Sequence, residues 1–408
     1  MTFKQKCLTL CFLSALCFLS ALITGGFSAA IGLVSPQIST YYNVDISNIV
    51  YIDVLNIVGL LIGNFFSGRL IEKINTHNTL CSAIALGIIA ESLLALGLPL
   101  SFYTACSMLN GISIGFLVPA VTQSISDLHT ISREKDSKLS LLNFFFSLGS
   151  VFVPIVGGYI THYLSWRGVF AMLAILYVFL LICALTFKIK PTCDNTPKSQ
   201  QSQTKNNQSI FNLSLILIGI ALVCYVYIEY VVSYWFSPYL QMDKHISVIE
   251  TGKLLGIFGA SIAAVRLIAG LYLLKKIRAT NYITLSCITV FIGFLFFLNS
   301  SSYFSFMASI ILIGCGCASL FPTLLGYGIA QANYQSPRAT SFLITCGSIG
   351  GFVGLIMSGF LGQHVDKVTP IYVAPILAFI IIAIIFVTVL NNRYGRLKAP
   401  NTNYKSTK

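Results

Sequence analysis

Charged residues are scarce in this 408-residue chain, and their scarcity argues against a soluble fold. Asp, Glu, Lys and Arg make up 9% of the sequence, whereas hydrophobic residues make up 56% and the mean hydropathy is +0.83. Soluble domains carry about 25% charged residues. A chain of this composition could not bury all of its apolar side chains away from water. We therefore expect most of its length to lie in a lipid bilayer.

Signatures of catalysis and metal binding are also missing. The sequence has no glycine-rich phosphate-binding loop, so it contains no internal ATP-driven motor. Its five His residues lie at the ends of apolar stretches, and no Cys/His spacing matches a zinc site. Most of the twelve Cys lie in or beside apolar stretches, which favours packing over disulfide bonding. We predict no enzyme activity, no catalytic residue, no cofactor and no metal site. The rival classes, a membrane-embedded enzyme or a sensor, would need clustered polar groups or a soluble domain.

In place of these features the chain has twelve apolar stretches. Each is long enough to cross a hydrocarbon core about 30 Å thick, which takes about twenty residues. Within lipid such a stretch must be helical, because no water is present to satisfy its backbone. The sequence therefore predicts an all-α membrane protein with spans at 8–36, 48–70, 79–98, 102–127, 139–162, 167–187, 210–240, 251–274, 281–299, 303–331, 339–363 and 370–391.

Positive charges fall in alternate gaps between these stretches. The N-terminus, every second gap and the C-terminal tail hold 20 of the 25 Lys and Arg residues. The positive-inside rule places those segments in the cytoplasm. The net charge of +13 thus indicates topology. Nucleic-acid binding, the competing interpretation, would favour a clustered basic surface. We predict a multi-pass protein of the bacterial inner (cytoplasmic) membrane with both termini cytoplasmic.

The spans divide into two groups of six. A Gln-, Asn-, Lys- and Ser-rich stretch at 188–209 has no periodicity and is typical of a flexible linker. Gly111 and Pro119 in the fourth span have counterparts 203 residues later in the tenth, at Gly314 and Pro322. Repeated halves with a substrate site between them are a known transporter plan. The predicted domains are an N-terminal half at 1–187, the linker at 188–209, a C-terminal half at 210–391 and a cytoplasmic tail at 392–408.

A short motif follows the second span. The segment GRLIEK, from Gly68 to Lys73, resembles the loop motif G-x-L-x-D-R of the major facilitator superfamily, with Glu72 in place of the usual Asp. In that family the motif joins the second and third helices and latches the cytoplasmic side. A second, partial copy starts at Gly270 and lacks the acid. The resemblance implies a twelve-helix fold of two six-helix halves, and a gating motif made of Gly68, Arg69, Glu72, Lys73, Arg266 and Gly270.

Longer segments resemble one branch of this family. LLNFFFSLGSVFVP (141–154), SLFPTLLGYGI (319–329) and TSFLITCGSIGG (340–351) are similar to the fucose:proton symporters, and most similar to their TsgA-like members. Fucose symporters carry one acid in the first helix and another in the fourth. Neither 25–37 nor 110–123 contains an acid here. The resemblance therefore implies a transporter and leaves its substrate open.

Four ionisable residues lie inside the predicted spans, where charges are costly and often functional. Glu229 is near the middle of the seventh span, and Tyr225 and Ser233 share its helix face. Glu229 is the first candidate for proton coupling, and Asp53 is the second. Glu91 lies on a helix expected to support the bundle from outside the cavity. We expect Arg266 to form an ion pair in the cytoplasmic gate.

Uncharged polar residues on the cavity helices complete the predicted site. A small polar solute needs hydrogen-bond donors and acceptors beside apolar and aromatic surfaces. Interhelical hydrogen bonding is the alternative role for each such residue. The substrate-cavity candidates are Gln37, Asn110, Gln123, Asn143, Tyr225, Ser233, Tyr327 and Gln331.

Together these observations predict a secondary active transporter. It would move a small polar solute, such as a sugar or related metabolite, by alternating access with proton symport. The alternative is an efflux antiporter of the same fold for drugs or metabolites. The expected partners are a small-molecule substrate, protons and the lipid bilayer, with no nucleic acid. We expect a monomer.

Overall fold

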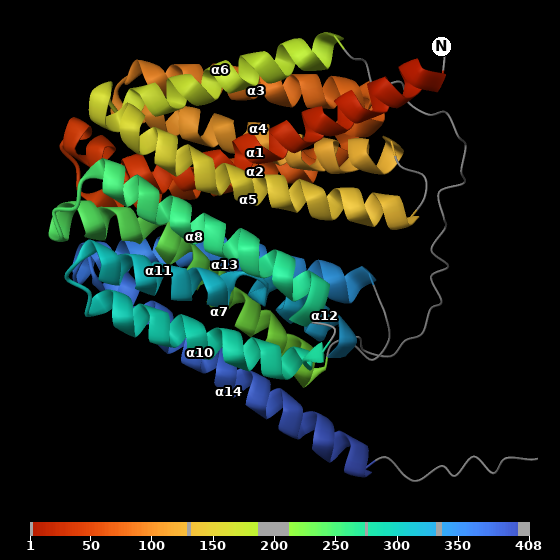
Figure 1. Cartoon of the computed structure of the whole chain (residues 1–408), viewed down its shortest axis with the longest axis vertical. Helices are drawn as coiled ribbons and strands as arrows, with labels where there is room; N and C mark the ends of the chain where they lie inside the picture. The colour runs from red at the N-terminus through yellow and green to blue at the C-terminus, as the bar shows by residue number, and fades with distance from the viewer. Residues whose placement is uncertain (1–2, 129–131, 187–211, 274–275, 332–336, 399–408) are drawn as a thin grey trace, which may run out of the picture.

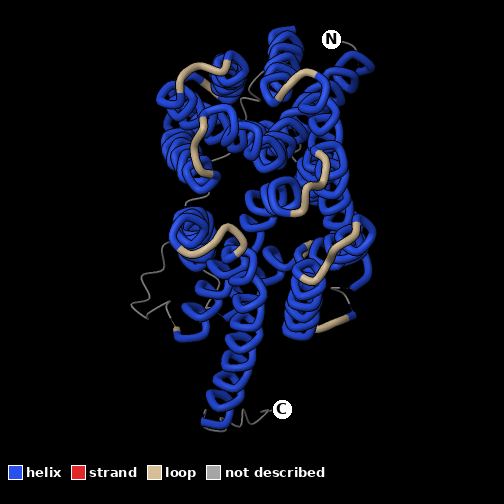
Figure 2. The backbone as a smooth tube through the Cα atoms, turned by 90° about the vertical axis from the view of Figure 1, so that its left-hand side faces the viewer, coloured by secondary structure: helices blue, strands red, loops and turns tan. Residues whose placement is uncertain are grey.

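The computed structural model describes residues 3–128, 132–186, 212–273, 276–331 and 337–398. All secondary-structure elements in these ranges are helices, joined by short loops. Twelve helical segments in these ranges are long and apolar enough to cross a membrane. They run side by side (Figure 1), and the tube in Figure 2 shows only helices and connecting loops. The predicted all-α membrane fold is confirmed.

The spans lie near their predicted positions, but the first, fifth and twelfth helices extend several residues beyond theirs, and the tenth span keeps its predicted bounds of 303–331 and is interrupted. The helices of the N-terminal half are α1 (Phe3–Tyr42), α2 (Ile46–Ile74), α3 (Thr76–Leu96), α4 (Leu100–Leu128), α5 (Ser132–Tyr163) and α6 (Trp166–Thr186). Those of the C-terminal half are α7 (Leu213–Pro238), η1 (Tyr239–Asp243), α8 (Val248–Ile268), η2 (Ala269–Leu273), α10 (Ala279–Leu298), α11 (Tyr303–Cys317), α12 (Leu320–Gln331), α13 (Pro337–His364) and α14 (Thr369–Lys398). The predicted linker at 188–209 lies outside the described residues.

Short polar residues set the starts of several helices. The side chain of Asp45 accepts a hydrogen bond from the backbone N–H of Ser47 before α2, and Asn212 accepts one from Leu215 before α7. Such caps satisfy N–H groups that have no partner within the helix. Helix α3 ends at Gly97, whose φ of 65° is the left-handed conformation that glycine adopts freely.

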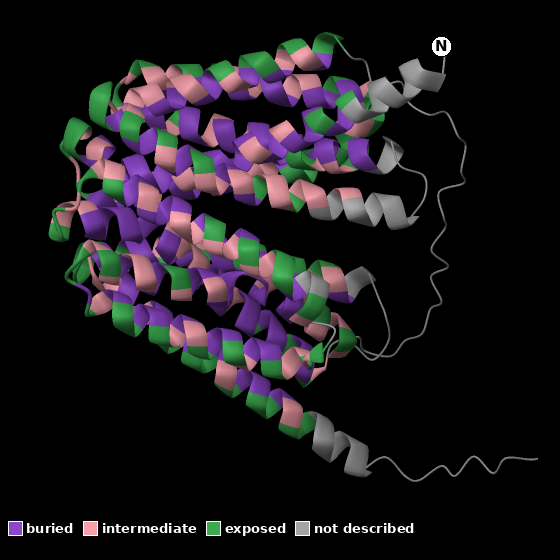
Figure 3. Cartoon of the chain, viewed as in Figure 1, coloured by how far each residue is buried: buried purple, intermediate pink, exposed green. Residues whose placement is uncertain are grey.

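The helices form two groups, with α1–α6 above α7–α14 in Figure 1. Buried residues are concentrated toward the middle of the molecule and exposed ones on the outward faces (Figure 3). Within the N-terminal group, α2 and α4 meet at glycine positions. A Cβ added at Gly59 or Gly111 would collide with the backbone of the other helix, at Met108 or Asn56 respectively. Small residues thus allow these two backbones to touch.

The two groups pack directly at one end, which we call the Asp45 end because it holds the α1–α2 loop. Gly32 of α1 lies against the backbone of Ser233 on α7. Gly158 of α5 lies against the start of α8, and Gly359 of α13 lies against the ring of Tyr51 on α2. The halves are therefore closed against one another at the Asp45 end.

The tenth span is broken between α11 and α12, and Pro322 explains the break. Proline has no N–H, so Pro322 cannot donate to the carbonyl of Ala318 four residues earlier. Arg266 of α8 donates to that carbonyl instead, at 2.9 Å. The hydroxyl of Tyr225 on α7 donates to the neighbouring carbonyl of Cys317, at 3.0 Å. Side chains of two other helices thus replace the missing helical bonds.

Candidate functional site

Two adjoining cavities lie at the junction of the halves. The smaller has a volume of about 340 Å³ and the larger about 960 Å³. Ser147 of α5, Glu229 of α7 and Arg266 of α8 line both of them. These three residues therefore mark the boundary between the cavities, and they come from both halves of the chain.

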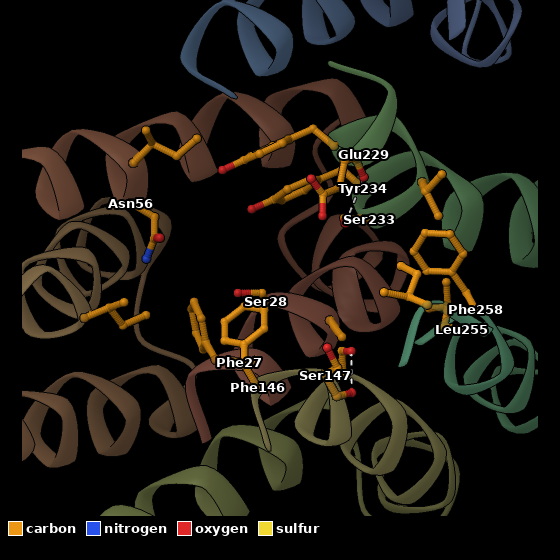
Figure 4. Close-up of a pocket in the computed structure, with 18 of the residues that line it drawn as sticks. Phe27, Ser28, Asn56, Phe146, Ser147, Glu229, Ser233, Tyr234, Leu255 and Phe258 are labelled. Atoms are coloured by element: carbon orange, nitrogen blue, oxygen red, sulfur yellow. Dashed lines mark hydrogen bonds between the residues drawn. The ribbon is translucent and has the colours of Figure 1, made fainter. Parts of the chain in front are cut away.

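The smaller cavity has aromatic walls and scattered hydroxyl groups. Figure 4 shows Glu229 and Tyr234 on one side, with Ser28 and Phe146 facing them across the open space. Asn56 lies at one end, and Leu255 and Phe258 lie at the other. Aromatic faces with a few polar groups are typical of sites for small polar ligands.

The larger cavity extends toward the end opposite Asp45. Asn143 and Phe144 of α5 contribute from the N-terminal half. The C-terminal half contributes residues around the break in the tenth span and the first turns of α13, including Ser319, Phe321, Pro322, Ile344 and Ser348. The break that Pro322 creates therefore forms part of the cavity wall.

Arg266 connects the two halves through its guanidinium group. Its Nε–H donates to the carbonyl of Ala318 at 2.9 Å, and its Nη1 donates to Oγ of Ser147 at 3.2 Å. Arg266 was expected to form an ion pair in the cytoplasmic gate. The structure places it in the cavity wall with two uncharged acceptors, because the carbonyl freed by Pro322 lies within its reach.

Glu229 is half-buried and opens onto both cavities. Its carboxylate interacts electrostatically with Arg266 and contacts the hydroxyl of Tyr225. Ser233, one turn later, donates its hydroxyl hydrogen to the backbone carbonyl of Glu229 at 3.0 Å. The predicted shared face of Tyr225, Glu229 and Ser233 is present, with Tyr225 on the larger cavity and Ser233 on the smaller.

The two acids inside the spans of the N-terminal half, Asp53 and Glu91, are buried and line neither cavity. Glu91 and Asn110 are both 0% exposed, and the Asn110 amide donates to Glu91 Oε1 at 2.9 Å. Asp53 is also 0% exposed, and neither carboxylate oxygen has a hydrogen-bond partner among the described residues. Asp53 interacts electrostatically with Tyr103 of α4 and with Tyr234, which lines the smaller cavity.

The predicted cavity residues separate into two groups. Asn143, Tyr225 and Ser233 line the cavities. Asn110 faces Glu91 on α3 instead, where its amide donates a hydrogen bond to the buried carboxyl group. Gln37 donates to Gln241 at 2.6 Å, which joins the halves at the Asp45 end. The remaining candidates, which are not among the lining residues of the described cavities, are Gln123, Tyr327 and Gln331.

The motif from Gly68 to Lys73 was expected in the loop after the second span, but it forms the last turns of α2, at the surface and outside the lining of both cavities. Gly68, Arg69, Glu72 and Lys73 are exposed, and Arg69 lies over the rings of its neighbours Phe65 and Phe66. A Cβ added at Gly68 would meet nothing within 4 Å, so no other helix packs closely against Gly68 in this conformation. The backbone of Gly270 lies in the π-helical turn η2.

Sequence reasoning missed the aromatic wall. Phe27, Phe146, Tyr234 and Phe258 line the smaller cavity, but an aromatic residue in an apolar span equally fits lipid or helix packing. Pro322, in contrast, was informative, because a proline inside a helix leaves one backbone carbonyl without its N–H donor. Together with Arg266 in a neighbouring span, it could have indicated a side chain that binds this carbonyl.

Comparison with known proteins agrees with this architecture. The Major Facilitator Superfamily family model matches residues 16–354. A protein TsgA homolog of Edwardsiella ictaluri is 24% identical over 358 residues, covering 85% of this chain and 87% of the relative. A TsgA homolog of Buchnera aphidicola subsp. Baizongia pistaciae is 24% identical over 385 residues, covering 93% and 97%. A crystal structure of D-xylose-proton symporter superposes with a TM-score of 0.76 at 14% identity, covering 92% of this chain and 96% of that one.

Proposed function

Because this chain belongs to the major facilitator superfamily, it is a multi-pass membrane transporter and not an enzyme, and we propose that it carries a small polar solute together with a proton. Transport would proceed by alternating access, in which the two six-helix halves rock about a central site. The proposed topology places the Asp45 end outside the cell. The closed seam at that end then describes a state open toward the cytoplasm.

One observation carries the proposal: Glu229 and Arg266 lie at the boundary of both cavities, between the halves. A carboxyl group inside a membrane protein is costly unless it is satisfied or used. Glu229 opens onto the cavities, so a proton and a solute could reach it from the same side. Arg266 binds Ser147 in the other half and would therefore respond when the halves separate.

The cavity walls suit a sugar or a related metabolite. Phe27, Phe146 and Tyr234 offer faces on which a ring or a carbon chain can pack, and Ser28 and Asn56 offer hydrogen-bonding groups. The volume of about 340 Å³ suits a molecule of monosaccharide size. The fold shared with the D-xylose-proton symporter supports a sugar-type solute and a proton as coupling ion.

We propose Glu229 as the group that carries the proton and keep Asp53 as the second candidate. Asp53 has no partner for either oxygen among the described residues, but it lines neither cavity. The motif from Gly68 to Lys73, in the last turns of α2, is proposed to latch the cytoplasmic side when that side closes. The open space around Gly68 would then be filled by a neighbouring helix.

A pH-gradient experiment on reconstituted protein tests this proposal. A thermal-shift screen against sugars, amino acids, nucleosides and organic acids would first identify a solute. Vesicles with a gradient of about one pH unit should then accumulate that solute up to about tenfold for one proton per solute. Glu229→Gln should exchange solute but lose accumulation, and Asp53→Asn should accumulate it like the wild type.

The reverse result for the two variants would assign the proton to Asp53. Accumulation by both variants would show that neither acid couples the proton. Solute movement against the proton flux would identify the efflux antiporter. If no solute binds or moves, the proposed transport of a small polar solute is wrong.

We also propose the orientation, the membrane and the assembly state. Both termini would be cytoplasmic, in the inner membrane of a bacterium, with a monomer as the working unit. The proposed halves are 1–187 and 210–391, with the linker 188–209 and the tail 392–408 in the cytoplasm. A membrane-impermeant thiol reagent applied to intact cells should therefore spare Cys193 of the linker and label it after permeabilisation. Labelling of Cys193 in intact cells would reverse the orientation.

A further inference from the structure

The charges of the two cavities point to the chemical class of the solute. Among the described residues that line either cavity, Glu229 and Arg266 are the only charged ones. With Glu229 ionised, their charges cancel. They interact electrostatically, but Arg266 donates to Ser147 and Ala318 and not to the Glu229 carboxylate. The positive charge of Arg266 is therefore not neutralised by a direct ion pair with Glu229.

Arg266 keeps hydrogen-bonding capacity for a ligand. A guanidinium group has five N–H donors and stays charged in proteins. Two donors are engaged, with the carbonyl of Ala318 and the hydroxyl of Ser147. Capping a carbonyl does not require a positive charge, because Tyr225 does the same for Cys317 with a neutral hydroxyl. The charge of Arg266 thus needs another explanation, and a planar guanidinium binds carboxylates well.

The rest of the smaller cavity suits a hydroxylated carbon chain. Ser28, Asn56 and Ser233 supply uncharged hydrogen-bonding groups, and Phe27 and Tyr234 supply apolar faces. From this arrangement, and on the basis of the proposed transport function, we propose that the solute is a small polyhydroxylated carboxylate, or sugar acid. Its carboxylate binds Arg266, and its hydroxyl groups lie along the aromatic wall.

Charge balance then explains the proton. The empty site carries the positive Arg266 and the negative Glu229 and is neutral. A bound carboxylate adds one negative charge, and one proton from water, forming an O–H bond with the Glu229 carboxylate, restores neutrality. One anion and one proton cross together. No net charge moves, so transport is electroneutral.

The surroundings of Glu229 fit a single proton acceptor. The ionisable groups that face it are Arg266 on α8, Cys317 at the end of α11, and Tyr225 and Tyr230 on its own helix. The cavity residues contributed by α1, α2, α5, α12 and α13 are not ionisable. Of these groups, only a glutamate is ordinarily ionised near neutral pH, whereas cysteine and tyrosine keep their protons and arginine stays charged. Glu229 is therefore the group that can accept the proton.

Binding of matched probes to the purified full-length protein tests the inference. Calorimetry would compare D-gluconate with D-glucitol, and D-glucuronate with D-glucose, since each pair differs in the carboxylate. We expect an acid to bind at least about ten times more tightly than its neutral partner. Arg266→Gln should lose this preference, and Arg266→Lys should retain part of it.

Tyr225→Phe provides the matched control for the helix break. It removes the hydroxyl that caps Cys317 and contacts the Glu229 carboxylate, and it leaves both charges in place. Both affinities can fall in this variant, but the ratio of acid to neutral affinity should survive. If it disappears in Tyr225→Phe as fully as in Arg266→Gln, the helix break and not the charge decides the preference, and the inference fails.

Electrical measurements separate this inference from the proposed function. In vesicles, uptake of the acid should follow the pH gradient and be unchanged when a potassium diffusion potential is imposed. Proton-driven uptake of a neutral sugar that rises with an inside-negative potential would support the proposed function and overturn the sugar-acid assignment. Equal binding of acid and neutral partner would also overturn it. If neither class binds or moves, the sugar-acid inference fails, whereas the proposed function fails only if no solute of the wider screen binds or moves.

Discussion

Glu91 in the N-terminal half and Glu229 in the C-terminal half are both acids inside membrane spans, but their surroundings differ. Glu91 has no exposed surface, receives a hydrogen bond from Asn110 and lines neither cavity. Glu229 is half-buried, opens onto two cavities and lies near Arg266. A solute could reach the second acid and not the first.

The difference shows that position inside a membrane span does not by itself identify a functional acid. Glu91 belongs to a polar contact between α3 and α4, where an amide satisfies one of its oxygens. Such contacts hold helices together and are worth about 0.6 kcal/mol on average. Access from a cavity and a nearby unpaired cation are the features that separate Glu229 from Glu91.

The largest expected effect comes from making the same substitution at both acids. Glu229→Gln should abolish pH-driven accumulation, a loss of about tenfold for a gradient of one pH unit. Glu91→Gln should accumulate solute like the wild type, because glutamine still accepts the bond from Asn110. Uptake into vesicles measures both. If Glu91→Gln loses more accumulation than Glu229→Gln, the proposed difference between the two acids is wrong and proton transfer occurs in the N-terminal half.

An intermediate effect is expected where the halves meet. A Cβ at Gly32 would collide with the carbonyl oxygen of Ser233, on the helix that carries Glu229. Overpacking of this kind costs about 1–3 kcal/mol. Gly32→Ala should therefore disfavour the state closed at the Asp45 end by roughly 5- to 150-fold and slow solute exchange.

Gly326 supplies the matched control for that variant. A Cβ there would meet nothing within 4 Å, so Gly326→Ala should exchange solute at the wild-type rate. Equal rates in the two variants would show that the α1–α7 seam does not limit the cycle.

The smallest effect is expected at the rim of the Asp45 end. Lys367 and Asp45 form an ion pair of 3.3 Å that joins the halves, and both side chains are about 40% exposed. Burial alone would raise the pKa of Asp45, but hydrogen bonds from Ser47 and Lys367 outweigh it and hold the pKa below its usual value. An exposed pair of this kind contributes no more than about 1 kcal/mol.

The pH dependence of this pair follows from the direction of the shift. A lowered pKa gives stabilisation that is complete above the unfolded value, near 3.9, and lost as the pH falls through the native value. Lys367→Met should therefore lower the melting temperature slightly at pH 7 and by less at pH 3. An equal decrease at both pH values would show that the pair contributes through packing.

The sequence predicted the fold well because the bilayer imposes strict rules. Span lengths, the arrangement of Lys and Arg, and the Gly111/Pro119 repeat were sufficient to predict twelve helices in two halves. The face shared by Tyr225, Glu229 and Ser233 was also predictable, because helical periodicity determines it.

The sequence did not determine which neighbour each polar residue meets. Asn110 and Gln37 are polar residues of inward-facing helices, yet one bonds to Glu91 and the other to Gln241. Those pairings depend on helix rotation and tilt, which the packing of all the helices decides together. For the same reason the bond from Arg266 to the carbonyl freed by Pro322 was not predicted, and its role in the gate stays a prediction.

The glycine contact between α2 and α4 has a mechanical consequence. Gly63 on α2 lies against Gly115 on α4, and Gly59 and Gly111 each lie against the backbone of the other helix, so the two backbones touch over two successive turns with few side chains between them. A contact without long, flexible side chains resists shear and twisting. The two helices should therefore move as one rigid unit, and a displacement at Asn56 beside the cavity would reach Arg69 near the end of α2 with little loss.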